Sequence, residues 1–282
     1  MKNPTRLSLV LIFFVLICAV PALDAQVKRV THKTDRFDFG VGGTVSIVGA
    51  PTGSIRVEGW ANREVEISAE IEVQAANDAD LAILTKITGF ILQETIGKAA
   101  ITSTGTHDRR AIRKIDRKFP KHLIGVPYRI DYVIKVPRYT DLDINGGKGD
   151  LSIAGVEGAI KVNFIETEAK IDLVGGAIAA TFGSGSVDLT IPSQRWRGRF
   201  VDVSIASGTM NLFLPHGLNA DFDATILRTG KIENDFEGFK PKTRHTEFTE
   251  RSIAAKAGTG TIPLKFTVGD GTMTIRETGK GS

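Results

Sequence analysis

The sequence has 282 residues, with 36 lysines and arginines, 32 aspartates and glutamates, and one cysteine, Cys18. Its net charge of +4 is too small to indicate nucleic-acid binding by itself. A single cysteine excludes an internal disulfide and any metal site built from several thiolates. The length allows two ordinary domains or one elongated domain.

The first 25 residues have the pattern of a secretory signal peptide. Lys2 and Arg6 precede an apolar run, Leu7–Val20, and small residues follow at Ala22 and Ala25. The run is shorter than the roughly 20 residues that a membrane-spanning helix needs. We therefore expect cleavage near Ala25 and export of residues 26–282 to the periplasm, the outer cell surface or the extracellular space.

Five consecutive nonapeptides follow one another without a gap from Gly149 to Ser193. They read GDLSIAGVE, GAIKVNFIE, TEAKIDLVG, GAIAATFGS and GSVDLTIPS, and 14 of the 15 residues at their third, fifth and seventh positions are apolar. Alternation with period two places these side chains on one face of a strand. Glycine opens four of the five units and suits a corner of the chain. Each unit is therefore predicted to be one strand and one turn.

The same pattern of glycine, serine or threonine, and alternating apolar residues recurs outside this block. Its occurrences are Gly43–Ile47, Gly53–Val57, Gly185–Leu189, Gly208–Leu212, Gly260–Leu264 and Gly271–Ile275. Repeats of this kind bury their inward faces against neighbouring repeats. We expect residues 26–282 to form one all-β domain, a single-stranded β-solenoid that resembles a right-handed β-helix, with either two or three strands per turn.

One short helix is predicted at about residues 77–88. Asn77 is an acceptable N-cap, Asp78 and Asp80 suit the first turn, and apolar residues follow at helical spacing. We expect this helix to cover an open end or side of the stack, where strand edges would otherwise pair with other chains. Binding of a partner is the alternative.

A basic loop is predicted at about residues 107–122. It contains seven basic residues against two acidic ones, Asp108 and Asp116; the basic residues are Arg109, Arg110, Arg113, Lys114, Arg117, Lys118 and Lys121. Such a run is compatible with an ordinary solvated loop. It is also compatible with contact to an anionic partner, such as lipopolysaccharide, an acidic polysaccharide or a phospholipid surface.

A second candidate contact segment interrupts the nonapeptide register after Ser193. It contains Arg195, Trp196, Arg197 and Arg199. An aromatic ring among arginines can stack on a sugar or lie at a lipid interface. The alternative interpretation is that the tryptophan closes over a loop.

Catalytic and metal-binding motifs are absent from the sequence. The five histidines are scattered, and neither a nucleophile elbow nor a phosphate-binding loop occurs. Outward or same-face carboxylates could in principle serve a polysaccharide-active enzyme, but nothing in the sequence sets their pKa values apart. These residues are Asp141, Asp143, Asp172, Asp188, Asp221 and Asp223. We therefore predict no cofactor, no metal and no enzymatic activity.

The chain resembles the bacterial putative-adhesin family of repeated β proteins. The resemblance lies in Gly53–Trp60, the Val136–Pro137 junction before Leu142–Ile144, the nonapeptides, Ser207–Pro215 and Gly269–Ile275. It implies a right-handed β-helix-like stack in the cell envelope, and it carries over no active-site residues. The expected function is that of a non-enzymatic envelope or surface protein, an adhesin or assembly scaffold that binds an anionic glycan, a lipid surface or envelope proteins, and not nucleic acid. The alternatives are a polysaccharide-active β-helix enzyme and a periplasmic sensor or accessory protein.

Overall fold

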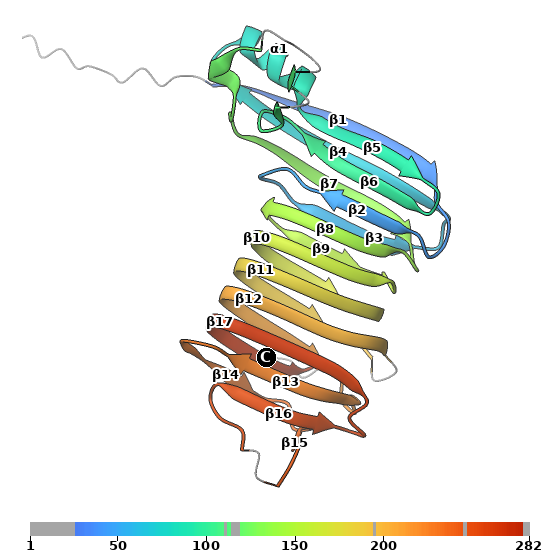
Figure 1. Ribbon diagram of the computed structural model, residues 1–282, viewed down its shortest axis with the longest axis vertical. Helices are drawn as coiled ribbons and strands as arrows, with labels where there is room; N and C mark the ends of the chain where they lie inside the picture. The colour runs from blue at the N-terminus through green and yellow to red at the C-terminus, as the bar shows by residue number, and fades with distance from the viewer. Residues whose placement is uncertain (1–25, 110–111, 114–118, 194–195, 245–246, 279–282) are drawn as a thin grey trace, which may run out of the picture.

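The computed structural model describes residues 26–109, 112–113, 119–193, 196–244 and 247–278. Within these ranges the backbone forms one α-helix and 17 strands, and all 17 strands belong to one mixed sheet (Figure 1). The prediction of a mostly β chain with one short helix is therefore confirmed. The predicted signal peptide lies outside the described residues.

The elements of the first half of the chain are β1 (Val27–Asp38), β2 (Thr44–Val48), β3 (Ile55–Trp60), β4 (Glu64–Ala75), α1 (Asp78–Ile87), β5 (Gly89–Thr95), β6 (Lys98–Thr104), a 3-10 turn (Lys121–Leu123), β7 (Tyr128–Pro137), β8 (Asp141–Lys148) and β9 (Leu151–Ala154). Those of the second half are β10 (Ala159–Asp172), β11 (Gly175–Thr190), β12 (Arg197–Leu214), β13 (Ala220–Ile226), β14 (Gly230–Asn234), β15 (Lys240–Pro241), β16 (Ser252–Ala257) and β17 (Ile262–Glu277).

The middle of the molecule is a stack of parallel strands. Leu142 of β8 pairs with Ile160 of β10, and Ile160 pairs in turn with Ile178 of β11. These partners are 18 residues apart, so two nonapeptides separate one layer from the next. The next partner of Ile178 is Val201, because the interruption after Ser193 lengthens the interval between β11 and β12.

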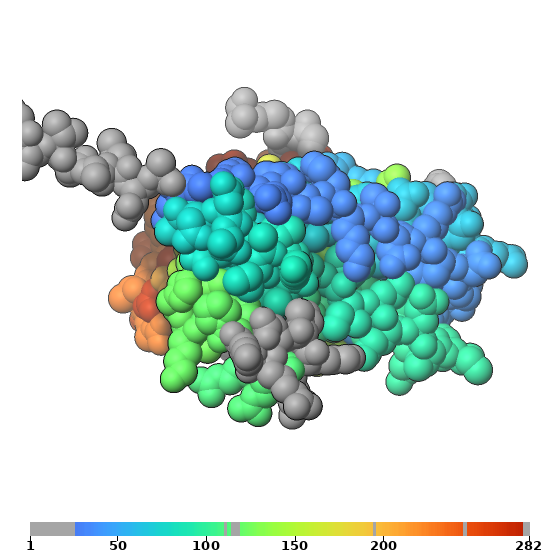
Figure 2. Space-filling model, turned by 90° about the horizontal axis from the view of Figure 1, so that it is seen from above, coloured from blue at the N-terminus to red at the C-terminus, as the bar shows by residue number. Residues whose placement is uncertain are grey.

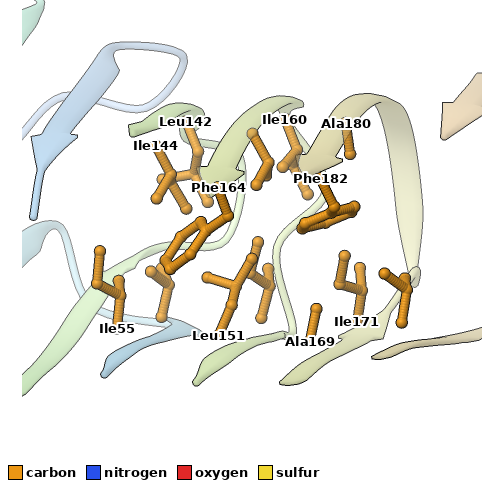
Figure 3. Close-up of a cluster of buried hydrophobic side chains, with 14 of the residues drawn as sticks. Ile55, Leu142, Ile144, Leu151, Ile160, Phe164, Ala169, Ile171, Ala180 and Phe182 are labelled. Carbon is orange, nitrogen blue, oxygen red and sulfur yellow. The ribbon is translucent and has the colours of Figure 1, made fainter. Parts of the chain in front are cut away.

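The apolar positions of the nonapeptides form the core. All 14 of the predicted apolar side chains are buried, and none is more than 5% exposed. Figure 3 shows how they meet between facing strands, with Ile160, Phe164 and Phe182 on one side and Leu151 and Ile171 on the other. Burying each large side chain of this kind stabilises the fold by roughly 1.5–3 kcal/mol. The core prediction is confirmed.

A column of glycines runs along one corner of the stack. Six of them have φ between +121° and +143°, which L side chains rarely adopt: Gly53, Gly149, Gly185, Gly208, Gly230 and Gly271. A Cβ atom added at any of the six would lie 1.7–2.1 Å from a carbonyl oxygen of the adjacent layer. Glycine is thus required here both for its backbone angle and because two backbones approach closely.

The strand order departs from the chain order near both ends of the stack. β17 pairs in parallel with β12 on one side and with β13 and β14 on the other. Likewise, β3 lies between β7 and β9, and β2 lies between β6 and β8. The sequence repeats predict each unit but not this order, because units of similar pattern fit next to one another regardless of their place in the chain.

The two ends of the stack are made of antiparallel pairs. At one end β1 pairs with β4, β4 with β7, and β5 with β6; at the other, β16 pairs with β13 and β15. Helix α1 packs against β4 and β1 at the first of these ends (Figure 1). It begins as predicted, since the side chain of Asn77 accepts a hydrogen bond of 2.9 Å from the backbone N–H of Asp80. The helix residues that are buried are Leu81, Leu84 and Ile87.

Candidate functional site

The basic loop lies at the end of the stack that carries β1, β5 and α1, and Figure 2 looks down on this end. Apolar residues anchor the loop, because Ile112 and Leu123 are buried in the core. His122 Nε2 lies 3.0 Å from Asp80 Oδ2 at the start of α1. The hydroxyl of Thr106 donates a hydrogen bond of 2.6 Å to the carbonyl of Val126, which closes the loop at its base.

Tyr128 lies under the base of this loop. Burial, followed by the nearby charge of Asp108, raises the pKa of Tyr128 to about 12. Its ring centroid is 6.0 Å from that of His107. The phenol of Tyr128 therefore stays neutral at physiological pH, and its ring packs beneath the loop.

The described cations of the loop are exposed to solvent. Arg109, Arg113 and Lys121 are all exposed, and no ion pair joins them to another described residue. The other four predicted contact residues, Arg110, Lys114, Arg117 and Lys118, lie outside the described residues. The structure thus brings three of the seven predicted residues onto one end of the molecule.

The cations of the neighbouring strand β1 differ, because glutamates of β4 neutralise several of them. Lys28 Nζ lies 2.8 Å from Glu72 Oε2, and Arg36 forms an ion pair with Glu64. The hydrogen bond from Lys28, followed by one from Gln74, lowers the pKa of the Glu72 carboxyl. Two cations of β1 are thus paired with glutamates, whereas no ion pair joins Arg29 or Lys33 to another described residue.

In the second candidate contact segment, which contains Trp196, the tryptophan ring is not exposed as contact with a sugar or lipid would require. Trp196 is only 7% exposed, and its indole ring lies over Gly198, where a Cβ atom would come within 2.0 Å of the ring. The ring therefore packs into the fold and is not available for stacking on a sugar. Arg197 and Arg199 are exposed at the start of β12, and Arg195 lies outside the described residues.

Most of the candidate carboxylates are held by neighbouring groups. Lys242 Nζ lies 2.5 Å from Asp221 Oδ1 and 2.7 Å from Asp223 Oδ2, so one cation bridges this pair. Asp188 Oδ1 accepts a hydrogen bond of 2.7 Å from the side chain of Asn211. Asp141 accepts one of 2.6 Å from the backbone N–H of Ala159. These contacts link adjacent layers of the sheet and do not set one carboxyl apart as an acid.

The part of the chain that the structure describes also bears on metal binding and on membrane-spanning helices. No group of three or more histidine, cysteine, aspartate or glutamate side chains is placed to hold a metal ion there. Among the same residues, no helix is both long enough and apolar enough to cross a membrane.

No protein-family model matches the chain, and no curated protein matches it either. Among solved structures, the chain is similar to a putative cell adhesion protein from Clostridium sporogenes, with 14% identity, 89% of this chain and 100% of that chain covered, and a TM-score of 0.47. It is also similar to a putative adhesin from Bacteroides fragilis, with 11% identity, 87% and 97% coverage, and a TM-score of 0.34. A third is a putative lipid binding protein from Parabacteroides distasonis, with 12% identity, 88% and 97% coverage, and a TM-score of 0.23.

Proposed function

We propose that this protein is a non-enzymatic component of the bacterial cell envelope, an adhesin or assembly scaffold whose basic loop binds an anionic glycan or lipid surface. The observation that carries the proposal is the loop itself, with seven basic and two acidic residues between positions 107 and 122. Its described cations are exposed beside a strand in which two cations, Lys28 and Arg36, are paired with glutamates. An exposed cluster of uncompensated positive charge attracts polyanions.

A β-solenoid is the architecture that we propose for this scaffold. The parallel register of 18 residues per layer and the glycine column along one corner support it. A rigid stack of this kind would hold the basic loop at one of its two ends. We further propose that residues 1–25 direct export, which would place the mature chain where envelope glycans and lipids occur.

The experiment replaces Arg109, Arg110, Arg113, Lys114, Arg117 and Lys118 with serine. Binding is measured to heparin as an acidic glycan and to vesicles that contain phosphatidylglycerol, over a range of salt concentrations. We expect the unaltered protein to bind and to lose affinity as salt rises, because exposed charges are screened over about 8–10 Å at physiological ionic strength. The loop variant should lose binding and keep its β circular-dichroism signal.

A matched control removes the same number of exposed cations from the opposite end of the stack. It replaces Lys231, Lys240, Arg244, Arg251, Lys256 and Lys265 with serine, all of which are exposed. Binding should persist in this control, and also when Arg197 and Arg199 are replaced. If the loop variant binds with unchanged affinity and salt dependence, the loop is not the contact; if the unaltered protein binds no polyanion, the proposal is wrong.

A further inference from the structure

A half-open pocket lies at the same end of the stack, between the facing edges of β1 and β5 and the C-terminal end of α1. Its volume is about 620 Å³, within the range of roughly 300–1,000 Å³ that is usual for small-molecule sites. Among the described strands, β1 pairs only with β4 and β5 only with β6, so the interior of the sheet opens between these two edges. Figure 2 shows the two segments on this end of the molecule.

One part of the pocket wall is apolar, and threonines and basic residues form the rest. Ile71, Ile87 and Phe90 line it and are otherwise buried, and Ile91 stands at the rim, 49% exposed. β5 begins with a glycine, Gly89, which lines this space. A Cβ atom added at Gly89 would meet only Ile71 Cδ1, at 3.8 Å, so nothing else fills this volume.

The titratable groups that line the pocket are all basic: His32, Lys33 and Lys86. Lys33 Nζ donates a hydrogen bond of 2.9 Å to the carbonyl of Phe90 and lies 4.0 Å from the centroid of the Phe90 ring. An ammonium group has three N–H donors, so two remain for a ligand. The carboxylate of Glu70 lies beside one of them, with its Oε2 3.9 Å from His32 Nδ1.

Thr88 also lines the pocket, is 8% exposed, and its Oγ1 has no hydrogen-bond partner among the described residues. This oxygen is fully buried, so a molecule in the open part of the pocket does not contact it, and it does not help to identify the ligand. The apolar part of the wall and the basic rim together fit one kind of molecule.

We infer that this pocket binds a single-chain amphiphile with an anionic head, of the long-chain carboxylate type. The alkyl chain would lie against Ile71, Ile87 and Phe90, and the carboxylate would accept hydrogen bonds from Lys33 at the rim. The inference does not depend on the basic loop, because no loop residue lines the pocket.

The test uses dodecanoate below its micelle concentration, with binding followed by isothermal titration calorimetry. We expect saturable binding at one molecule per chain. Dodecanol, which has the same chain without the charge, should bind at least roughly tenfold more weakly, as expected for the loss of a charge-assisted hydrogen bond. Lys33→Gln should weaken dodecanoate binding by a similar factor, and the control Lys161→Gln, on another face, should not.

Filling the pocket gives a variant that tests its location. Gly89→Ala should fit without overlap and reduce affinity only slightly, and Gly89→Leu should abolish binding with the circular-dichroism spectrum unchanged. Equal affinity for dodecanol and dodecanoate would overturn the anionic head, and unchanged binding by Gly89→Leu would overturn the site. Binding to phosphatidylglycerol vesicles without any binding of dodecanoate would also overturn it. The double variant Arg109→Ser, Arg113→Ser should bind dodecanoate normally, which separates failure of this inference from failure of the proposed function.

Discussion

Substitution of Gly208 by alanine tests whether the glycine column holds the layers of the sheet together. Gly208 has φ of +142°, and a Cβ atom added there would lie 1.9 Å from the carbonyl oxygen of Gly185 in the adjacent layer. Real Cβ atoms essentially never approach another atom within 3.0 Å, so either the alanine or the neighbouring layer would have to move. The strain of the positive φ and the displacement of the neighbouring layer both raise the free energy of the folded state and not that of the unfolded chain.

The size of the effect follows from adding these two costs. Holding a residue with a side chain at such a φ costs of order 1–3 kcal/mol. Moving a packed neighbour to relieve the overlap typically costs another 1–3 kcal/mol. The free energy of unfolding should therefore fall by about 2–6 kcal/mol, a large part of the 5–15 kcal/mol that is typical of a whole domain.

Two other glycines separate the contributions. Gly97 has φ of +72° with no atom within 4 Å of an added Cβ, so Gly97→Ala should show only the backbone cost of about 1–2 kcal/mol. Gly40 has neither a positive φ nor a close neighbour, so Gly40→Ala should be neutral or stabilising by about 0.4–1 kcal/mol. Urea unfolding followed by circular dichroism measures all three. A Gly208→Ala variant no less stable than Gly97→Ala would refute the close-approach reasoning.

The core and one surface ion pair give two more predictions. Phe182→Ala should lower the free energy of unfolding by roughly 3–5 kcal/mol, whereas replacing exposed Thr181, the preceding residue, should change it by no more than about 0.5 kcal/mol in the same denaturant titration. Hydrogen bonds from Arg228 and then Thr229 lower the pKa of the Asp270 carboxyl from 3.8 to about 2. The stabilisation that this ion pair provides should be fully present above about pH 4 and should be lost as the pH falls toward 2. Titration of the Asp270 carboxyl by NMR should therefore show a midpoint near 2, and Arg228→Gln should raise this midpoint while the hydrogen bonds from Thr229 keep it below 3.8; equal midpoints would contradict the assignment.

Local features of the fold could be predicted from the sequence because they depend on neighbouring residues. The helix cap at Asn77 and the inward positions of Phe164 and Phe182 follow from periodicity and side-chain chemistry alone. The order of the layers could not be predicted in this way. Leu264 of β17 pairs with Val201 and Phe222, and the strands that contain these three residues share the same alternation of apolar and polar residues. Patterns that are interchangeable locally do not specify which neighbour each will have.

Of the candidate site, too, one part could be predicted from the sequence and another part could not. A run of basic residues is visible in the sequence, and Arg109 and Arg113 are indeed exposed. The pocket is not visible there, since it joins Lys33, Ile71 and Phe90 from segments far apart in the chain. Burial of the Trp196 ring depends on the missing side chain of Gly198 beneath it, a contact that composition alone does not reveal.

The position of β17 also bears on how the protein is made. Ile262–Glu277 leaves the ribosome after β12 and β13, yet it lies between these two strands in the sheet. Until it arrives, those two strands have edges whose backbone groups lack their final partner, and such edges readily pair with other chains. The order of synthesis thus differs from the order of the strands in the sheet, and β12 and β13 are joined only after β17 has been synthesised.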